Sequence, residues 1–132
     1  MSYGLTRSIH RPFADVVADV RVALADQGFG VITEIDMKAT LKKKLDVDVE
    51  EQVILGACSP SHAYRALQAD ASIGLLLPCN VTVRQDGADT IVEMINPQTM
   101  VDLSDAPDMA AVASEVGEKL RAAMAAITDE MR

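Results

Sequence analysis

Apolar and polar positions follow two different periods along this chain, and the change of period predicts where strands and helices lie. Period-two alternation over "SYGLTRSI" is typical of a strand, whereas helical spacing of apolar residues over 12–27 predicts an amphipathic helix. Within 37–45, Met37, Leu41 and Leu45 share one helical face. The expected elements, in order, are strand 2–9, helix 12–27, strand 30–36, helix 37–45, strand 52–58, helix 60–69, strands 73–85 and 90–95, and a helix over 109–127.

Capping and turn residues support these boundaries. Gly28 suits the position just past the first helix, where a left-handed backbone is common. Asp36 is placed to cap the second helix, and Ser59 followed by Pro60 is typical of an N-cap and a first-turn proline. Asp86-Gly87 lies between two strand patterns and predicts a β-hairpin.

The predicted order is β-α-β-α-β-α-β-β-α, which favours an α+β fold. We expect a single-domain sandwich over residues 1–132, with helices on one face of a largely antiparallel sheet; a mixed sheet is the alternative. Pro78 cannot donate a ladder hydrogen bond, so its strand is expected to lie at an edge or to carry a bulge. A bare edge or an apolar second face is covered most simply by a second copy, which predicts a homodimer.

Composition and charge mainly exclude partners. The chain has 132 residues, of which 49% are hydrophobic, enough for a core without disulfide or metal staples. The formal net charge of −8 repels phosphate backbones. Two Tyr, two Phe and no Trp are too few for a base-stacking surface, so nucleic acid is not an expected partner.

The distribution of apolar segments argues against a membrane. The start of the chain lacks the apolar core of a secretory signal. The longest apolar run, around 73–79, is far shorter than the ~20 residues that span a bilayer. The expected location is the cytoplasm, where thiols stay reduced, so a disulfide is not expected.

Three blocks, taken together, resemble a known family. "GFGVITEIDMKATLKKKL", "ILGACSPSHAYRAL" and "IGLLLPCNVTV" are similar in order and length to the recurring blocks of the domain of unknown function 302 family. The resemblance runs from Tyr3 to about Met100; Ser59 stands where that family's block has Asn, and Ala71 where it often has Pro. It implies a small, mostly prokaryotic α+β domain that is dimeric and has no settled biochemical activity.

Two cysteines and a histidine carry most of the chemistry in these blocks. Cys58 precedes a helix start, where the helix dipole favours a thiolate, and His62 follows at i+4, near enough to pair with it. Cys79 is expected to share a strand face with Leu77 and Val81. Each cysteine is also a small residue in an apolar run, which suits a packed core. A reactive thiol and a packed core residue both stay open as interpretations.

Other chemistry finds little support in the motifs. Structural zinc sites use four ligands and usually a closely spaced cysteine pair, which this chain lacks, so no metal site is expected. No G-x-S-x-G, Walker A or G-x-G-x-x-G motif occurs. The sequence therefore assigns no reaction and no cofactor, and it leaves open whether the protein is an enzyme.

The remaining candidates lead to a ligand-binding hypothesis. Glu34, Asp36 and Lys38 lie at a strand-to-helix junction that is suited to an anion, with a solvated helix face as the alternative. We expect a small-molecule cleft near "ACSPSH" and "LLPCN", and a thiol-based sulfur-carrier or redox protein is the second hypothesis. The predicted ligand residues are Glu34, Asp36, Lys38, Cys58, Ser59, His62, Cys79 and Asn80.

Overall fold

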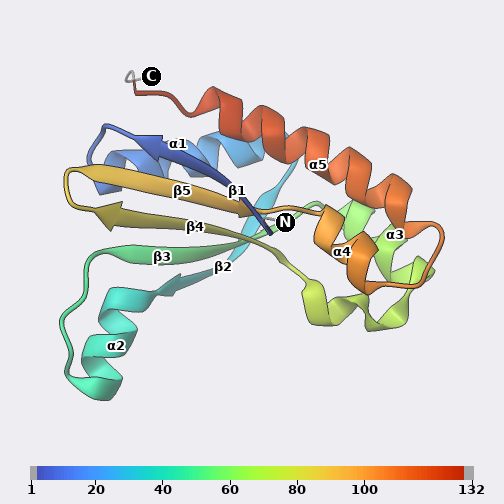
Figure 1. The fold of residues 1–132 in the computed structure, drawn as a ribbon, viewed down its shortest axis with the longest axis horizontal. Coiled ribbons are helices and arrows are strands. Elements are labelled where there is room, and N and C mark those ends of the chain that lie inside the picture. Colours follow the sequence, from blue (N-terminus) through green and yellow to red (C-terminus); the bar gives the residue numbers. More distant parts are fainter. Residues whose placement is uncertain (1–2, 130–132) are drawn as a thin grey trace.

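Residues 3–129 are described by a computed structural model. The elements are β1 (Gly4–Ile9), α1 (Phe13–Asp26), β2 (Gly30–Asp36), α2 (Met37–Leu45), β3 (Gln52–Cys58), α3 (Pro60–Ala69), the 3₁₀ helix η1 (Ala71–Leu76), β4 (Cys79–Asp86), β5 (Asp89–Ile95), α4 (Gln98–Leu103) and α5 (Met109–Ala126). The strands form one antiparallel sheet in the order β1-β5-β4-β3-β2. Figure 1 shows α3 and α4 gathered at one end of the molecule, whereas α2 projects from the other.

Alternation along the strands gives the sheet one apolar face. Val53, Leu55 and Ala57 of β3 are buried on this face, and alternate residues of β4 and β5 continue the layer. The long helices α1 and α5 cover it, and aliphatic burial of this kind is the main term that holds helices to a sheet. The buried hydrophobic residues of these helices are Val16, Val20, Ala23 and Leu24 of α1, and Met109, Val112, Ala113, Val116, Leu120, Ala123 and Met124 of α5. The expected α+β fold is confirmed.

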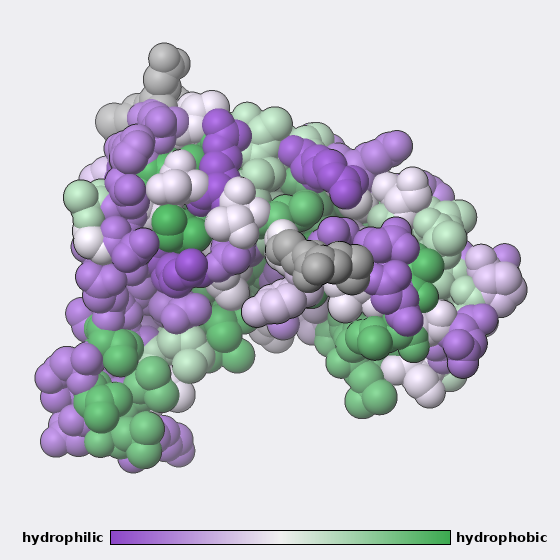
Figure 2. Space-filling model, in the orientation of Figure 1, coloured by the Kyte–Doolittle hydropathy of each residue, from purple (hydrophilic) through white to green (hydrophobic). Residues whose placement is uncertain are grey.

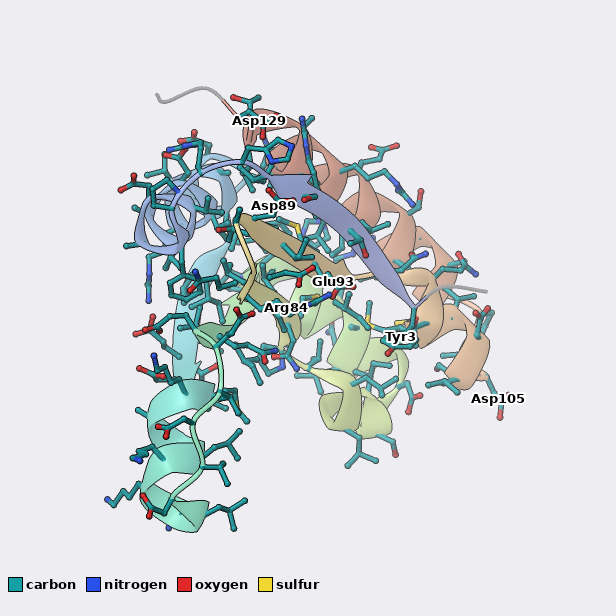
Figure 3. The ribbon with its side chains drawn as sticks, turned by 60° about the vertical axis from the view of Figure 1, so that its left-hand side comes forward. Tyr3, Arg84, Asp89, Glu93, Asp105 and Asp129 are labelled. Carbon is teal, nitrogen blue, oxygen red and sulfur yellow. The ribbon has the colours of Figure 1, made fainter. Side chains whose placement is uncertain are left out.

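The opposite face of the sheet carries polar side chains. Thr6 of β1 donates to Glu93 of β5, with 2.9 Å between Oγ1 and Oε2, and Arg84 of β4 pairs with the same carboxylate. Figure 3 shows Arg84 and Glu93 pointing toward one another. The hydrogen bond from Arg84 is the largest cause that holds the pKa of Glu93 below its usual range. An antiparallel sheet with one solvated face accommodates such a network.

The segment 73–85, expected to be one strand, contains two elements. Ala71–Leu76 is a 3₁₀ helix, and its N-cap Asp70 accepts a hydrogen bond from the amide of Ser72. β4 begins only at Cys79. The prediction was wrong for the first half because a short apolar run has the same appearance in a strand and in a helical turn.

Pro78 does not place its strand at an edge. The Leu77–Pro78 peptide is cis and precedes β4, which pairs with β3 on one side and β5 on the other. Because the proline lies just outside the strand, its missing N–H removes no ladder hydrogen bond. The expected edge position and bulge were both wrong for β4, and the register shift lies instead in β2, between Val31 and Thr33. All strand pairs are antiparallel, so the mixed-sheet alternative is also wrong.

Two helices differ from expectation in presence or packing. The segment between 95 and 109, for which no element was predicted, contains α4, which begins directly after Pro97. Helix α2 forms where it was predicted, but it buries none of its residues, and Leu45 is 66% exposed. Of the shared face of α2, Met37 and Leu41 are half-buried and only Leu45 is exposed.

Gly56 of β3 is a close-contact position, because an added Cβ would lie 2.7 Å from Pro78 Cγ and would also overlap Thr33 Oγ1. We expect Gly56→Ala to lower the free energy of unfolding in urea by about 1–3 kcal/mol, the usual effect of overpacking. Gly74→Ala is the control, since its Cβ would meet Leu67 Cδ2 at an ordinary 3.9 Å. An unchanged free energy of unfolding in Gly56→Ala would contradict this close packing.

Candidate functional site

A pocket of about 230 Å³ opens where the ends of β3 and β4 meet α3 and α5. Most of its lining is apolar, and polar or sulfur-bearing side chains also contribute. Four of the predicted ligand residues lie together in this lining: Cys58, Ser59, His62 and Cys79. The apolar lining consists of Phe29, Ile32, Ala57, Ala63, Ala66, Leu77, Pro78, Met100, Val112 and Val116.

The polar part of the pocket forms where β3 leads into α3. β3 ends at Cys58, Ser59 is the N-cap with an extended backbone, and Pro60 begins the helix. The Ser59 hydroxyl makes no capping hydrogen bond; its Oγ lies 2.7 Å from Nδ1 of His62. Ser59 is therefore at the N-cap position, as predicted. Its hydroxyl does not bond a backbone amide of the first turn, because the imidazole of His62 lies within hydrogen-bonding distance instead.

His62 lies between Ser59 and a carboxylate from α5. Its side chain is buried, and Nε2 lies 3.3 Å from Oε1 of Glu115. Arg65, one turn further along α3, donates two hydrogen bonds of 2.8 Å, one to each oxygen of Glu115. A bidentate pair of this kind fixes the orientation of the carboxylate.

The bidentate pair also determines which atoms carry protons. Hydrogen bonding from Arg65 is the largest cause that lowers the pKa of Glu115 to about 2, and a hydrogen bond with His62 contributes further. Glu115 is therefore an anion, and only an acceptor, at neutral pH. In the neutral imidazole, the nitrogen that faces Glu115 carries the proton, so Nδ1 accepts and the Ser59 hydroxyl donates.

The two cysteines are free thiols in different environments. Cys79 is 7% exposed, and burial, with a smaller effect of Cys58, raises its pKa to about 11. Cys58 is only half-buried. The i+4 pairing of Cys58 with His62 is not formed, because the two ring nitrogens contact Ser59 and Glu115 instead.

The other predicted ligand residues lie outside this pocket. Glu34 is exposed and pairs with Arg21, with 2.6 Å between Oε1 and Nη2. Asp36 accepts a hydrogen bond from a first-turn amide of α2, and Lys38 pairs with a glutamate just before β3. Asn80 is exposed and lines a separate hollow formed by β1, β4 and β5. The structure thus divides the predicted set into one cluster and four outlying residues.

Sequence analysis did not predict Arg65 or Glu115 as residues of the site. Glu115 is separated from His62 by 53 positions. The local signals were present but incomplete: Glu115 lies between Val112 and Val116 in the apolar stripe of α5, and Arg65 follows His62 at helical spacing. Which turn of α3 faces which turn of α5 depends on how the helices cross, and neither segment specifies that alone.

Within residues 3–129, no three His, Cys, Asp or Glu side chains cluster in a way that would hold a metal ion. The helices of this part of the chain are all too short or too polar to cross a bilayer.

The fold and the pocket define the class of protein: a small α+β domain with a five-stranded antiparallel sheet and an apolar cavity at its end. The chain belongs to the family described as Domain of unknown function DUF302, whose model matches residues 5–127. It is similar in structure to an uncharacterized conserved protein DUF302 from Bacillus stearothermophilus, with a TM-score of 0.88, 24% identity, and coverage of 96% of this chain and 99% of that chain. At 24% identity, this similarity shows that the two chains share a fold. No curated protein matches the sequence.

Burial should separate the reactivities of the two thiols. At neutral pH, we expect iodoacetamide to modify Cys58 in the native protein and to leave Cys79 largely unmodified, because a pKa of about 11 keeps that thiol protonated. The Cys79 rate should rise as the pH approaches this value. Peptide mass spectrometry measures both sites, and urea-unfolded protein is the control in which they react alike. Equal native rates at neutral pH would contradict the difference in environment.

Proposed function

We propose that this protein binds a small organic molecule in the pocket between β3, β4, α3 and α5. The observation that carries the proposal is the lining: ten apolar side chains surround a volume of about 230 Å³, together with the hydroxyl of Ser59 and the imidazole of His62. Small-molecule sites commonly combine an apolar wall with a few placed polar groups.

The volume limits the size of the ligand. A cavity of about 150 Å³ takes up benzene, so a pocket of about 230 Å³ suits one substituted ring or a short branched chain. Phe29 and Met100 offer aromatic and thioether contacts to such a group. A hydroxyl, carbonyl or carboxylate on the ligand would face Ser59 and His62.

A thiol-based role is the second candidate, and the environments of the cysteines favour Cys58 as its centre. Cys58 is half-buried, lines the pocket and lies one residue before the N-cap of α3. The burial of Cys79 opposes the thiolate form at that position. Two free thiols also suit the proposed cytoplasmic location, where such groups stay reduced.

We also propose that the protein is a homodimer joined through the α2 arm, which we define as residues 35–51. α2 buries none of its residues. Figure 2 shows apolar side chains gathered over this projection, at the lower left. An exposed apolar surface of this kind commonly marks an interface. The exposed apolar residues of the arm are Ile35, Leu45, Val47 and Val49.

Charges on the α2 arm favour a second copy as the occupant. Lys42, Lys43 and Lys44 end α2, and Asp46, Asp48, Glu50 and Glu51 follow in the loop before β3. A two-fold dimer places the same patch on both sides of the interface. Within one chain, Lys42 already pairs with Asp46 and Asp48. Two arms packed in opposite directions would add contacts between the basic end of one and the acidic loop of the other while covering both apolar surfaces.

Filling the pocket should abolish binding. We expect para-fluorobenzyl alcohol, observed by fluorine NMR, to bind the unmodified protein and to lose its binding in Ala63→Leu, because the longer side chain occupies the apolar pocket. Ala122→Leu makes the same change at an exposed position of α5 and should bind normally. Equal binding by Ala63→Leu, or no binding by the unmodified protein, would contradict the proposed site.

Charging the α2 arm should separate the dimer. We expect the unmodified protein to sediment as a dimer in analytical ultracentrifugation, and Leu45→Asp to sediment as a folded monomer, because the new carboxylates would be buried against each other. Leu103→Asp changes a similarly exposed leucine on α4 and should leave the dimer intact. A monomeric unmodified protein, or a dimer unaffected by Leu45→Asp, would exclude this interface.

A further inference from the structure

Four side chains beside the pocket form one continuous chain of polar contacts. Ser59 Oγ lies 2.7 Å from His62 Nδ1, and His62 Nε2 lies 3.3 Å from Glu115 Oε1. Arg65 holds both oxygens of Glu115 at 2.8 Å. A hydroxyl within reach of a base that is itself oriented by a third group has the geometry of an activated nucleophile, whatever fold carries it.

The contacts of Ser59 differ from those of a serine that only caps a helix. A capping serine accepts a hydrogen bond from a backbone amide of the first turn, whereas the Ser59 hydroxyl makes no such contact and lies 2.7 Å from Nδ1 of His62 instead. Because Glu115 requires the proton on Nε2, the lone pair of Nδ1 points at the hydroxyl. The imidazole is thus in the tautomer that can remove the serine proton.

We propose that this protein catalyses acyl transfer from small apolar esters to water, with Ser59 as the nucleophile and His62 as the general base. The inference goes beyond the proposed binding function and rests on it in one respect, namely that the pocket admits an organic molecule. Glu115 and Arg65 do not touch the reacting atoms in this scheme, and they act as positioning residues.

The proton movements of the reaction follow from these contacts. Ser59 Oγ attacks the ester carbonyl carbon while its proton moves to Nδ1 of His62. The tetrahedral intermediate breaks its bond to the alcohol, which takes that proton and leaves the acyl group on Ser59. A water molecule then gives a proton to Nδ1 and attacks the acyl group. The carboxylic acid leaves, and the proton returns to Ser59 Oγ.

Helix α3 also offers stabilisation to the developing oxyanion. Ser59 is its N-cap, and the first amides of a helix have no acceptor within it. Pro60 has no N–H, so the amides of Ser61 and His62 are the nearest donors of this kind. The positive end of the helix dipole lies at the same place.

The pocket lining restricts the acyl group. Val112, Val116 and Met100 are apolar pocket walls and would exclude a charged acyl chain, because burying an unpaired charge is costly. With a volume of about 230 Å³, the pocket suits a short aliphatic or single-ring acyl group. The substrate class is therefore esters of small apolar carboxylic acids.

Covalent labelling gives the most direct test. A short-chain alkyl fluorophosphonate phosphonylates an activated serine with loss of fluoride. We expect one adduct per chain, mapped by peptide mass spectrometry to Ser59, absent in Ser59→Ala and retained in Ser61→Ala, whose serine is exposed on the same helix. Hydrolysis of para-nitrophenyl butyrate should fall at least about tenfold in Ser59→Ala and in His62→Gln.

The mapping on the unmodified protein decides the question even if a variant fails to fold. No adduct, or an adduct at Cys58 or Ser61, overturns acyl transfer by Ser59. Binding of para-fluorobenzyl alcohol separates this inference from the binding function. If the alcohol binds and labelling fails, only acyl transfer is overturned, whereas failure of both overturns both.

A comparison of kcat with KM tests the positioning role of Glu115. The groups near His62 are Arg65 on the same helix, Glu115 from α5, and the thiols of Cys58 and Cys79 from β3 and β4. Glu115→Gln removes the carboxylate that faces Nε2 of His62 and leaves the residues that line the pocket unchanged. We therefore expect kcat for para-nitrophenyl butyrate to fall while KM stays unchanged. An unchanged kcat, or a change confined to KM, overturns this role.

Discussion

The packing of α5 against both the sheet and α3 is the constraint on which the fold and the pocket depend. The buried stripe of α5 belongs to the same hydrophobic core as α1 and the apolar face of the sheet, and α5 packs directly against α1 and α3. Its N-terminal half supplies Val112 and Val116 to the pocket wall and Glu115 to the contacts with α3. Side chains three and four residues apart on a helix project from neighbouring positions. One short stretch of α5 therefore provides both an apolar wall and an anchored carboxylate.

The polar groups beside the pocket are satisfied by one another. His62 is buried, and each of its ring nitrogens has a partner, which avoids the cost of an unsatisfied buried polar group. Arg65 spans from α3 to α5 through Glu115, so the same contacts that orient the imidazole also join two helices. Orientation of Ser59 and attachment of α5 are thus consequences of one network.

Local patterns were reliable wherever a single period dominated. The amphipathic helices α1 and α5 and the hairpin around Gly87 follow directly from apolar spacing and turn residues. The patterns failed in the apolar run that contains Pro78, because its first half is a 3₁₀ helix and its strand is central. An apolar run indicates that a segment can be buried, but it does not identify the elements that pack against that segment. Helix α2, which is amphipathic in sequence but buries none of its residues, illustrates the same limit.

Apolar spacing, turn residues and the order of the blocks were enough to predict the α+β class, the order of most elements, the family and the two blocks that carry Cys58, Ser59, His62 and Cys79. They could not predict that these four residues share one pocket, or that Glu34, Asp36, Lys38 and Asn80 lie outside it. The tertiary structure also shows that His62 faces Ser59 and Glu115 rather than a thiol. The physical reason is that periodicity is a property of one segment. A contact across 53 positions depends on how α3 and α5 cross, which the packing of the whole core sets.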